Sequence, residues 1–188
     1  MKRKILKFLY TFPKVETLIK FLEINGKNLI EFCVGDDDVL LNSAIAKFCP
    51  NLKSLCTIFT DIELETVKMI LNNCQYLENL RVWCGDEDGF LNEKEFLDIL
   101  VKYSPKNFYK LEIYNCCSSK ILPEELEEFF IGWKNRMPQK SFSLTIYKDF
   151  DDEVSLEVNV KNMEIIEKYK KMGVIKKFMT RKHNYYED

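Results

Sequence analysis

The stretches CPNLKSLCTI at residues 49–58 and CQYLENLRVW at residues 74–83 carry cysteine, leucine and leucine at the same offsets. The same spacing of apolar residues recurs at six places along the chain, which indicates an internal repeat. The first repeated position holds Leu29, Leu52, Leu77, Phe108, Ser141 and Ile175. Three residues later, the second position holds Phe32, Leu55, Leu80, Leu111, Leu144 and Phe178. Two residues after that, the third position holds Val34, Thr57, Val82, Ile113, Ile146 and Thr180. Most copies predict a short strand with alternate side chains buried. Ser141 and the two threonines fit this pattern less well.

Segments with helical periodicity separate these strands. Their apolar stripes are Val15, Leu18, Ile19 and Leu22; Leu41, Ala44, Ile45 and Phe48; Leu64, Val67, Leu71 and Cys74; Phe96, Leu97, Leu100 and Val101; Leu126, Phe129, Phe130 and Trp133; and Met163, Ile166 and Tyr169. The helix-start signals are Thr60 with Glu63, Asn92 with Glu95, and Pro123, and the helix-end signals are Gly26 and Gly173. Cys49 and Cys74 fall where a helix ends and the chain returns to the sheet, a place that suits a small buried hydrophobic residue.

Alternating strands and helices at a nearly constant period predict an α/β solenoid, with a curved parallel sheet inside and helices outside. A doubly wound sheet is the alternative, but it would not repeat one apolar triplet in every strand. We expect a single domain over residues 1–188, with residues 1–26 as an N-terminal capping helix region and residues 181–188 as a polar tail.

The composition excludes several other classes of protein. Hydrophobic residues make up 46% of the chain and charged residues 31%, and the net charge of −2 gives no general attraction to nucleic acid. No apolar run reaches the roughly 18 residues of a membrane span. Seven cysteines without a C-x-x-C pair, and His183 as the single histidine, match no zinc-site spacing, so we expect no metal and no cofactor. Reduced thiols favour the cytoplasm or the nucleus.

With L-x-x-L-x-L strands and cysteines near helix ends, the chain resembles leucine-rich repeats of the cysteine-containing, helix-bearing subtype. This subtype occurs in the F-box substrate receptors of ubiquitin ligases. The phrases FCPNLKSL, NNCQYLENLRVWCG and LPEELEEFFIGWKNRMPQKS are similar to the expanded F-box-like families of mycorrhizal fungi. The resemblance implies that the repeats hold a protein substrate and that an N-terminal F-box docks on the ligase adaptor.

The chain departs from the F-box plan. Only a short segment precedes the first repeat-like helix, so we expect no F-box there. The stretch LPEELEEFF at residues 122–130 imitates an F-box opening, but its place between two repeat strands favours an ordinary capped helix. A ligase adaptor is therefore an expected partner only if the chain carries an F-box equivalent.

The inward strand triplets leave the alternate residues on the concave face, where solenoids often bind their partners. Trp83, Tyr114 and Tyr147 then stack across three strands, with Arg81 and Glu112 side by side one position earlier. Aromatic residues and arginine dominate binding hot spots, so these five residues form the predicted site for a protein partner. The alternatives are that the aromatic residues only cover the sheet, or that a register slip of one residue buries them.

Three acidic loops, at residues 35–38, 85–89 and 148–153, are predicted to share one rim. Such a rim could attract a basic partner, but aspartates that cap helix N-termini explain the same pattern. The sequence also contains no phosphate-binding glycine loop. We therefore expect an interaction module and no enzyme, either a substrate receptor or a repeat-only scaffold or competitor without ligase recruitment. An enzyme that uses Cys33 or Cys56 as a thiol nucleophile is the alternative from another class.

Overall fold

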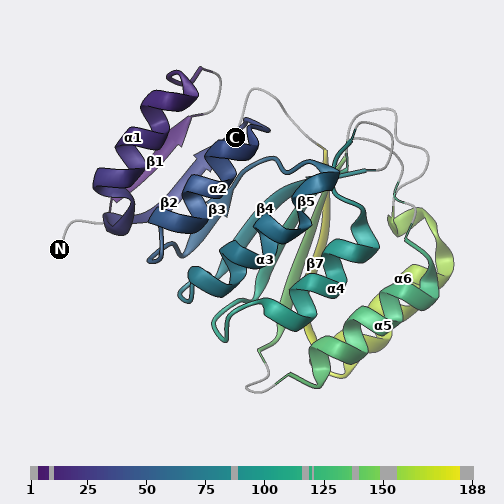
Figure 1. Ribbon diagram of the computed structural model, residues 1–188. Helices are drawn as coiled ribbons and strands as arrows, with labels where there is room; N and C mark the ends of the chain where they lie inside the picture. Colours follow the sequence, from purple (N-terminus) through teal and green to yellow (C-terminus); the bar gives the residue numbers. More distant parts are fainter. Residues whose placement is uncertain are drawn as a thin grey trace.

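The computed structural model describes residues 4–8, 11–85, 89–115, 119, 121–136, 140–148 and 156–182. Within these ranges the chain forms an α/β fold with a seven-stranded parallel sheet and six α-helices (Figure 1). The strands are β1 (Lys4–Phe8), β2 (Leu29–Val34), β3 (Ser54–Cys56), β4 (Asn79–Cys84), β5 (Lys110–Asn115), β6 (Phe142–Lys148) and β7 (Ile175–Lys182). The helices are α1 (Val15–Asn25), α2 (Val39–Phe48), α3 (Leu64–Asn73), α4 (Glu93–Tyr103), α5 (Pro123–Lys134) and α6 (Val160–Lys171).

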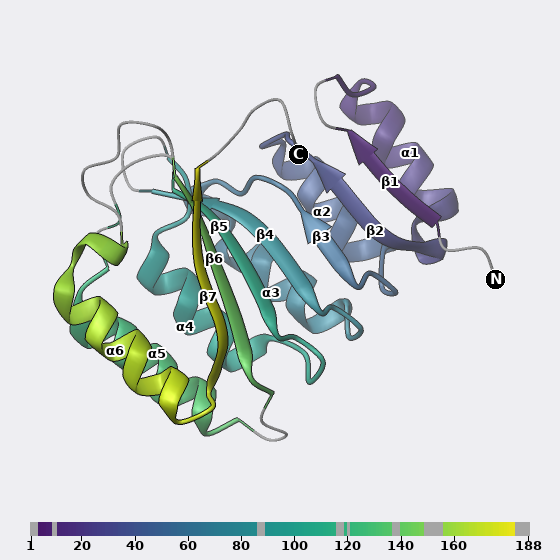
Figure 2. The ribbon, with the colours of Figure 1, turned by 180° about the vertical axis from the view of Figure 1, so that it is seen from behind.

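The strands lie in the sheet in the order in which they occur in the sequence, from β1 to β7. All six of these helices cover the same face of the sheet, each packed against the next (Figures 1 and 2). The opposite face, which we call the open face, carries none of them. A doubly wound sheet has helices on both faces and a reversal of strand order, so that alternative is excluded for the described part of the chain.

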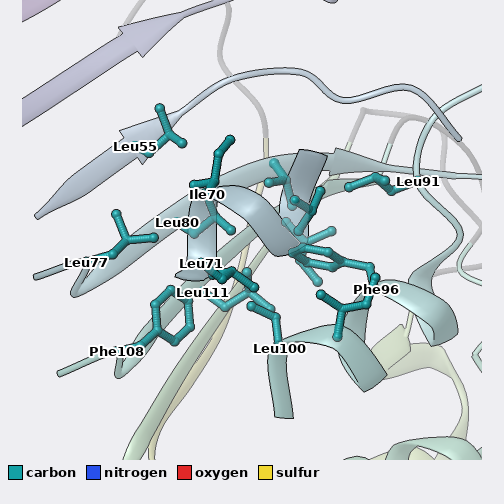
Figure 3. Close-up of a cluster of buried hydrophobic side chains, with 14 of the residues drawn as sticks. Leu55, Ile70, Leu71, Leu77, Leu80, Leu91, Phe96, Leu100, Phe108 and Leu111 are labelled. Carbon is teal, nitrogen blue, oxygen red and sulfur yellow. The ribbon is translucent and has the colours of Figure 1, made fainter. Parts of the chain in front are cut away.

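The predicted strand register is confirmed at its central position. Pairing of neighbouring strands aligns Phe32, Leu55, Leu80, Leu111, Leu144 and Phe178 in one row across the sheet. The leucines of this row are buried beneath the helices. Figure 3 shows Leu80 and Leu111 close to Leu71 of α3 and Leu100 of α4. Burial of this apolar layer is the main force that joins each strand to its helix.

The repeated cysteine lies where the sequence places it. Cys49 ends α2 and Cys74 ends α3, both without exposed surface, and the Cys74 thiol lies 3.3 Å from the Cys49 carbonyl oxygen, to which it donates. Gly26 ends α1 at the equivalent place. A Cβ atom on Gly26 would lie 2.6 Å from the Phe48 carbonyl oxygen and 2.9 Å from the Cys49 sulfur, so only glycine fits there. The two opening stretches are therefore successive turns of one structure.

The helix signals are confirmed as well. The Glu63 carboxylate accepts hydrogen bonds from the backbone and hydroxyl of Thr60, and the Asn92 side chain accepts one from the Glu95 N–H. Pro123 is the first residue of α5. The stretch at residues 122–130 thus forms an ordinary helix between two strands of the sheet.

The structure corrects the sequence predictions at both ends. Residues 1–26 contain a strand, β1, as well as the expected helix, because Leu6 and Phe8 face the core in register with Phe32 and Val34. At the other end Arg181 and Lys182 belong to β7, so the strand extends into the predicted polar tail. The rest of that tail, with His183, lies outside the described residues, as does most of the acidic loops at 85–89 and 148–153.

One strand position was assigned to the wrong residue. Ser141 is exposed, and Phe142, which pairs with Ile175, is completely buried in its place. A register irregularity between Phe142 and Ser143 restores the pattern from Leu144 onward. Phe142 packs against Phe129 and Trp133 of α5, which explains why this unit needs a large aromatic side chain at the position.

Candidate binding face

Three rows of side chains cross the open face, because residues of like position in parallel strands stand side by side. The first row holds Glu31, Ser54, Asn79, Lys110, Ser143 and Lys177. The second, which we call the thiol row, holds Lys7, Cys33, Cys56, Arg81, Glu112, Thr145 and Met179. The third, the aromatic row, holds Trp83, Tyr114, Tyr147 and Arg181. The five predicted site residues lie together in the second and third rows, without the register slip considered above.

The aromatic row forms a continuous stack. The ring centroids of Trp83 and Tyr114 are 4.5 Å apart with planes at 11°, and those of Tyr114 and Tyr147 are 4.4 Å apart with planes at 16°. The guanidinium of Arg81 lies 5.8 Å and 5.6 Å from the two tyrosine ring centroids. Stacking of rings and a nearby cation each contribute favourably, so the stack holds its side chains in a fixed orientation.

Glu112 joins the stack to the charged residues around it. Its carboxylate lies 2.9 Å from the Lys110 ammonium and 3.2 Å from Arg81 Nε, and it accepts a hydrogen bond from the Tyr147 hydroxyl at 3.5 Å. Burial raises the pKa of Glu112, but the hydrogen bonds and positive charges of Lys110 and Arg81 outweigh it, so its pKa lies below the ordinary range. Burial lowers the pKa of Arg81, yet Glu112 and the two tyrosines raise it overall. Both groups therefore stay charged at neutral pH.

A cavity of about 420 Å³ opens on the same face, beside the aromatic row. Its lining combines four cations with three carboxylates and two thiols: Lys7, Lys53, Arg81, Lys110, Glu31, Glu78, Glu112, Cys33 and Cys56. Lys7 pairs with Glu31 at 3.5 Å and Lys53 with Glu78 at 2.8 Å, so the charges of opposite sign alternate across the cavity. Its volume falls in the range of ligand pockets, but its lining is much more polar than that of most small-molecule sites.

The five predicted residues differ in how much surface they offer. Tyr114, Tyr147 and Glu112 are only 3–4% exposed, whereas Arg81 and Trp83 are partly exposed. A partner would therefore touch Arg81, Trp83 and the rim of the cavity. The buried residues Tyr114, Tyr147 and Glu112 hold Arg81 and Trp83 in position. The sequence predicted the rows but not the cavity, because Lys53 and Glu78 lie before their strands and Lys7 belongs to β1, which the repeat pattern does not predict.

Cys33 and Cys56 are register partners in β2 and β3. A hydrogen bond with Cys33 and burial both raise the pKa of the Cys56 thiol, although Arg81 opposes them. A cysteine nucleophile needs a lowered pKa, so Cys56 has the opposite of the expected property. Among the described residues, no three His, Cys, Asp or Glu side chains lie close enough to hold a metal ion.

The one acidic loop that is fully described favours the capping interpretation. The Asp38 carboxylate accepts a hydrogen bond from the Leu41 N–H at 2.9 Å at the start of α2. Burial and the neighbouring charges of Asp38 and Asp37 raise the pKa of Asp36. Repulsion among these carboxylates is thus partly offset by the helix N-terminus.

The sequence matches no known protein-family model, and no curated protein is similar to it. In the part of the chain that the structure describes, the helices are too short and too polar to cross a membrane. The geometry of the open face is therefore the feature that bears on function.

Proposed function

We propose that the protein is a leucine-rich-repeat solenoid of the cysteine-containing kind that binds another protein on its open face. The sequential strand and helix units, the leucine row and the residues Gly26, Cys49 and Cys74 at equivalent helix ends support this architecture. The finer class rests on the resemblance of the repeat phrases.

The open face is the observation that carries the proposal. Three aligned rows of polar and aromatic side chains lie where the described helices do not cover the sheet, and they surround a charged cavity. Trp83 and Arg81, the accessible members of the predicted site, are residue types that concentrate binding energy. The stack beneath them is ordered before binding, which lowers the entropy cost of association.

The role that fits the resemblance is substrate recognition of the kind performed by F-box receptors of ubiquitin ligases. A scaffold that binds its partner without a ligase is the alternative, because residues 122–130 form a repeat helix and supply no F-box. The thiols favour a reducing compartment, the cytoplasm or the nucleus.

Affinity purification with matched variants tests the proposal. The open-face variant combines Trp83→Ala with Lys53→Glu, both at accessible positions of the site. The control combines Lys20→Glu and Lys102→Glu, which lie exposed on α1 and α4 of the covered face. Tagged wild type and both variants are expressed in cells, and the bound proteins are quantified by mass spectrometry, with circular dichroism to verify folding.

We expect a set of proteins that binds the wild type and the control and is lost with the open-face variant. A ligase adaptor and cullin that remain bound to all three forms would indicate a receptor with an F-box equivalent. Their absence, with the other partners present, would indicate the scaffold. If no protein distinguishes the open-face variant from the control, the proposal fails.

A further inference from the structure

The thiol pair on the open face has the geometry of a bond that can form and break. Cys33 and Cys56 are direct register partners in neighbouring parallel strands. Such partners lie about 4.8 Å apart, within the range of Cα distances that disulfides span. The two side chains are close enough for Cys33 to raise the pKa of the Cys56 thiol. Of the five described cysteines, only these two line the cavity, while Cys49, Cys74 and Cys84 are buried elsewhere.

The surroundings give the two sulfurs different roles. Cys33 is partly exposed at the cavity wall, whereas Cys56 is 8% exposed, so an incoming reagent reaches Cys33 first. Lys7 is the register partner of Cys33, so a cation lies in the row beside the more exposed thiol. Arg81 is the register partner of Cys56, but it does not outweigh the neighbouring Cys33 and the burial that raise the pKa of that thiol, so Cys33 is the first nucleophile. Positive charge stabilises the thiolate, which is the reactive form in thiol–disulfide exchange.

We propose that Cys33 and Cys56 form a reversible dithiol–disulfide site that reacts with low-molecular-weight disulfides entering the cavity. The Cys33 thiolate attacks one sulfur of the reagent RSSR, forms a mixed disulfide and releases RS⁻. The Cys56 thiolate then attacks the Cys33 sulfur, closes the internal disulfide and releases a second RS⁻. The two cysteine protons pass to the two leaving thiolates. The cysteines are thus oxidised, and one RSSR is reduced to two RSH.

The position in the sheet makes the internal disulfide reversible. Cys33 is partly exposed at the cavity wall, so an incoming thiol can reach the internal disulfide. Exposed disulfides are more readily reduced than buried ones and are typical of regulatory sites. The bond would fix the two strands beneath the cavity. This exchange reaction does not depend on partner binding, because it is measured on the isolated protein.

Exchange with oxidised glutathione tests the site. The background is the full chain with Cys116→Ser and Cys117→Ser, because these neighbouring cysteines, which lie outside the described residues, could form mixed disulfides of their own. Reduced protein is incubated with oxidised glutathione, alkylated under native and then denaturing conditions, and mapped by peptide mass spectrometry. Cys33→Ser, Cys56→Ser and Cys56→Ala variants are treated alongside, with circular dichroism to verify that each is folded.

We expect a cross-link between the Cys33 and Cys56 peptides that dithiothreitol removes, while Cys49 and Cys74 are alkylated only after denaturation. The Cys56 variants should accumulate glutathione on Cys33, and Cys33→Ser should accumulate none. The proposal fails if Cys33 and Cys56 can both still be alkylated after treatment with oxidised glutathione. It also fails if glutathione remains on Cys33 of the background protein and no cross-link to Cys56 forms.

Discussion

Among the described residues, two pairs of cysteines lie on opposite faces of the sheet. Cys49 and Cys74 end two successive helices on the covered face, and Cys33 and Cys56 pair across two successive strands on the open face. Burial raises the pKa of both helix-end thiols to about 12, so they remain protonated and act as small apolar side chains. The open-face pair lines a cavity beside two cations, and although the pKa of Cys56 is raised as well, Cys33 is partly exposed.

The contrast shows how the two faces of one parallel sheet differ in chemistry. Side chains that point toward the helices make one continuous apolar layer, whereas those that point away make rows of charged, polar and aromatic groups. Successive residues of a strand alternate between these two faces. Neighbouring substitutions in one strand should therefore have very different effects.

The largest effect is expected within β4, where Leu80 and Asn79 are adjacent but point to opposite faces. Leu80 is 1% exposed in the core, so Leu80→Ala should lower the free energy of unfolding by about 3 kcal/mol. Asn79→Ala should cost only about 1 kcal/mol, because it removes the hydrogen bonds that the Asn79 side chain donates to Ser54 and Glu112 but opens no cavity in the core. Urea unfolding measures both. Equal losses for the two variants would contradict the separation of the faces.

A smaller effect is expected at Glu112, the one buried carboxylate of the predicted site. Glu112→Gln removes the negative charge between Lys110 and Arg81 and should cost about 2 kcal/mol at neutral pH. Glu78→Gln is the matched control on the same face, where the exposed pair with Lys53 should contribute at most about 0.5 kcal/mol.

The pH dependence of the Glu112 variant follows from the sign of its pKa shift. The folded state holds the pKa of Glu112 below its unfolded value of about 4.3. The carboxylate therefore contributes stability above that value, and this contribution is lost as the pH falls through the folded pKa. The difference in stability between wild type and Glu112→Gln should shrink between pH 6 and pH 3. A constant difference over that range would show that charge is not the cause.

Much of the fold could be predicted, because a parallel sheet in sequence order repeats the same burial in every unit. The triplet around Leu80 fixed the register of β2 to β7, and with it the neighbours Trp83, Tyr114 and Tyr147. The strand β1 was missed, because it is short and Lys7 interrupts its apolar residues. Phe142 was missed because the register irregularity before Ser143 breaks the count.

The candidate site was only partly predictable for a physical reason. Register tells which side chains are neighbours, and it placed Arg81 beside Glu112 correctly. Exposure depends on how closely the neighbours stack, and strand pattern does not contain that information. Tyr114 is buried between the rings of Trp83 and Tyr147, whose centroids lie 4.5 Å and 4.4 Å from its own. It was expected to contact a partner, but it instead holds its neighbours in position.

The smallest difference returns to the two cysteine pairs. Cys49→Ala removes a fully buried sulfur that lies close to Gly26 and should cost about 1 kcal/mol, because the rigid helix end cannot close the space. Cys33→Ala removes a partly exposed sulfur at a cavity wall, where water can replace it, and should cost at most about 0.5 kcal/mol. Thermal unfolding of both variants under reducing conditions measures the difference. A greater loss for Cys33→Ala would mean that the open-face thiols also hold the sheet together, and that stability and recognition share this row.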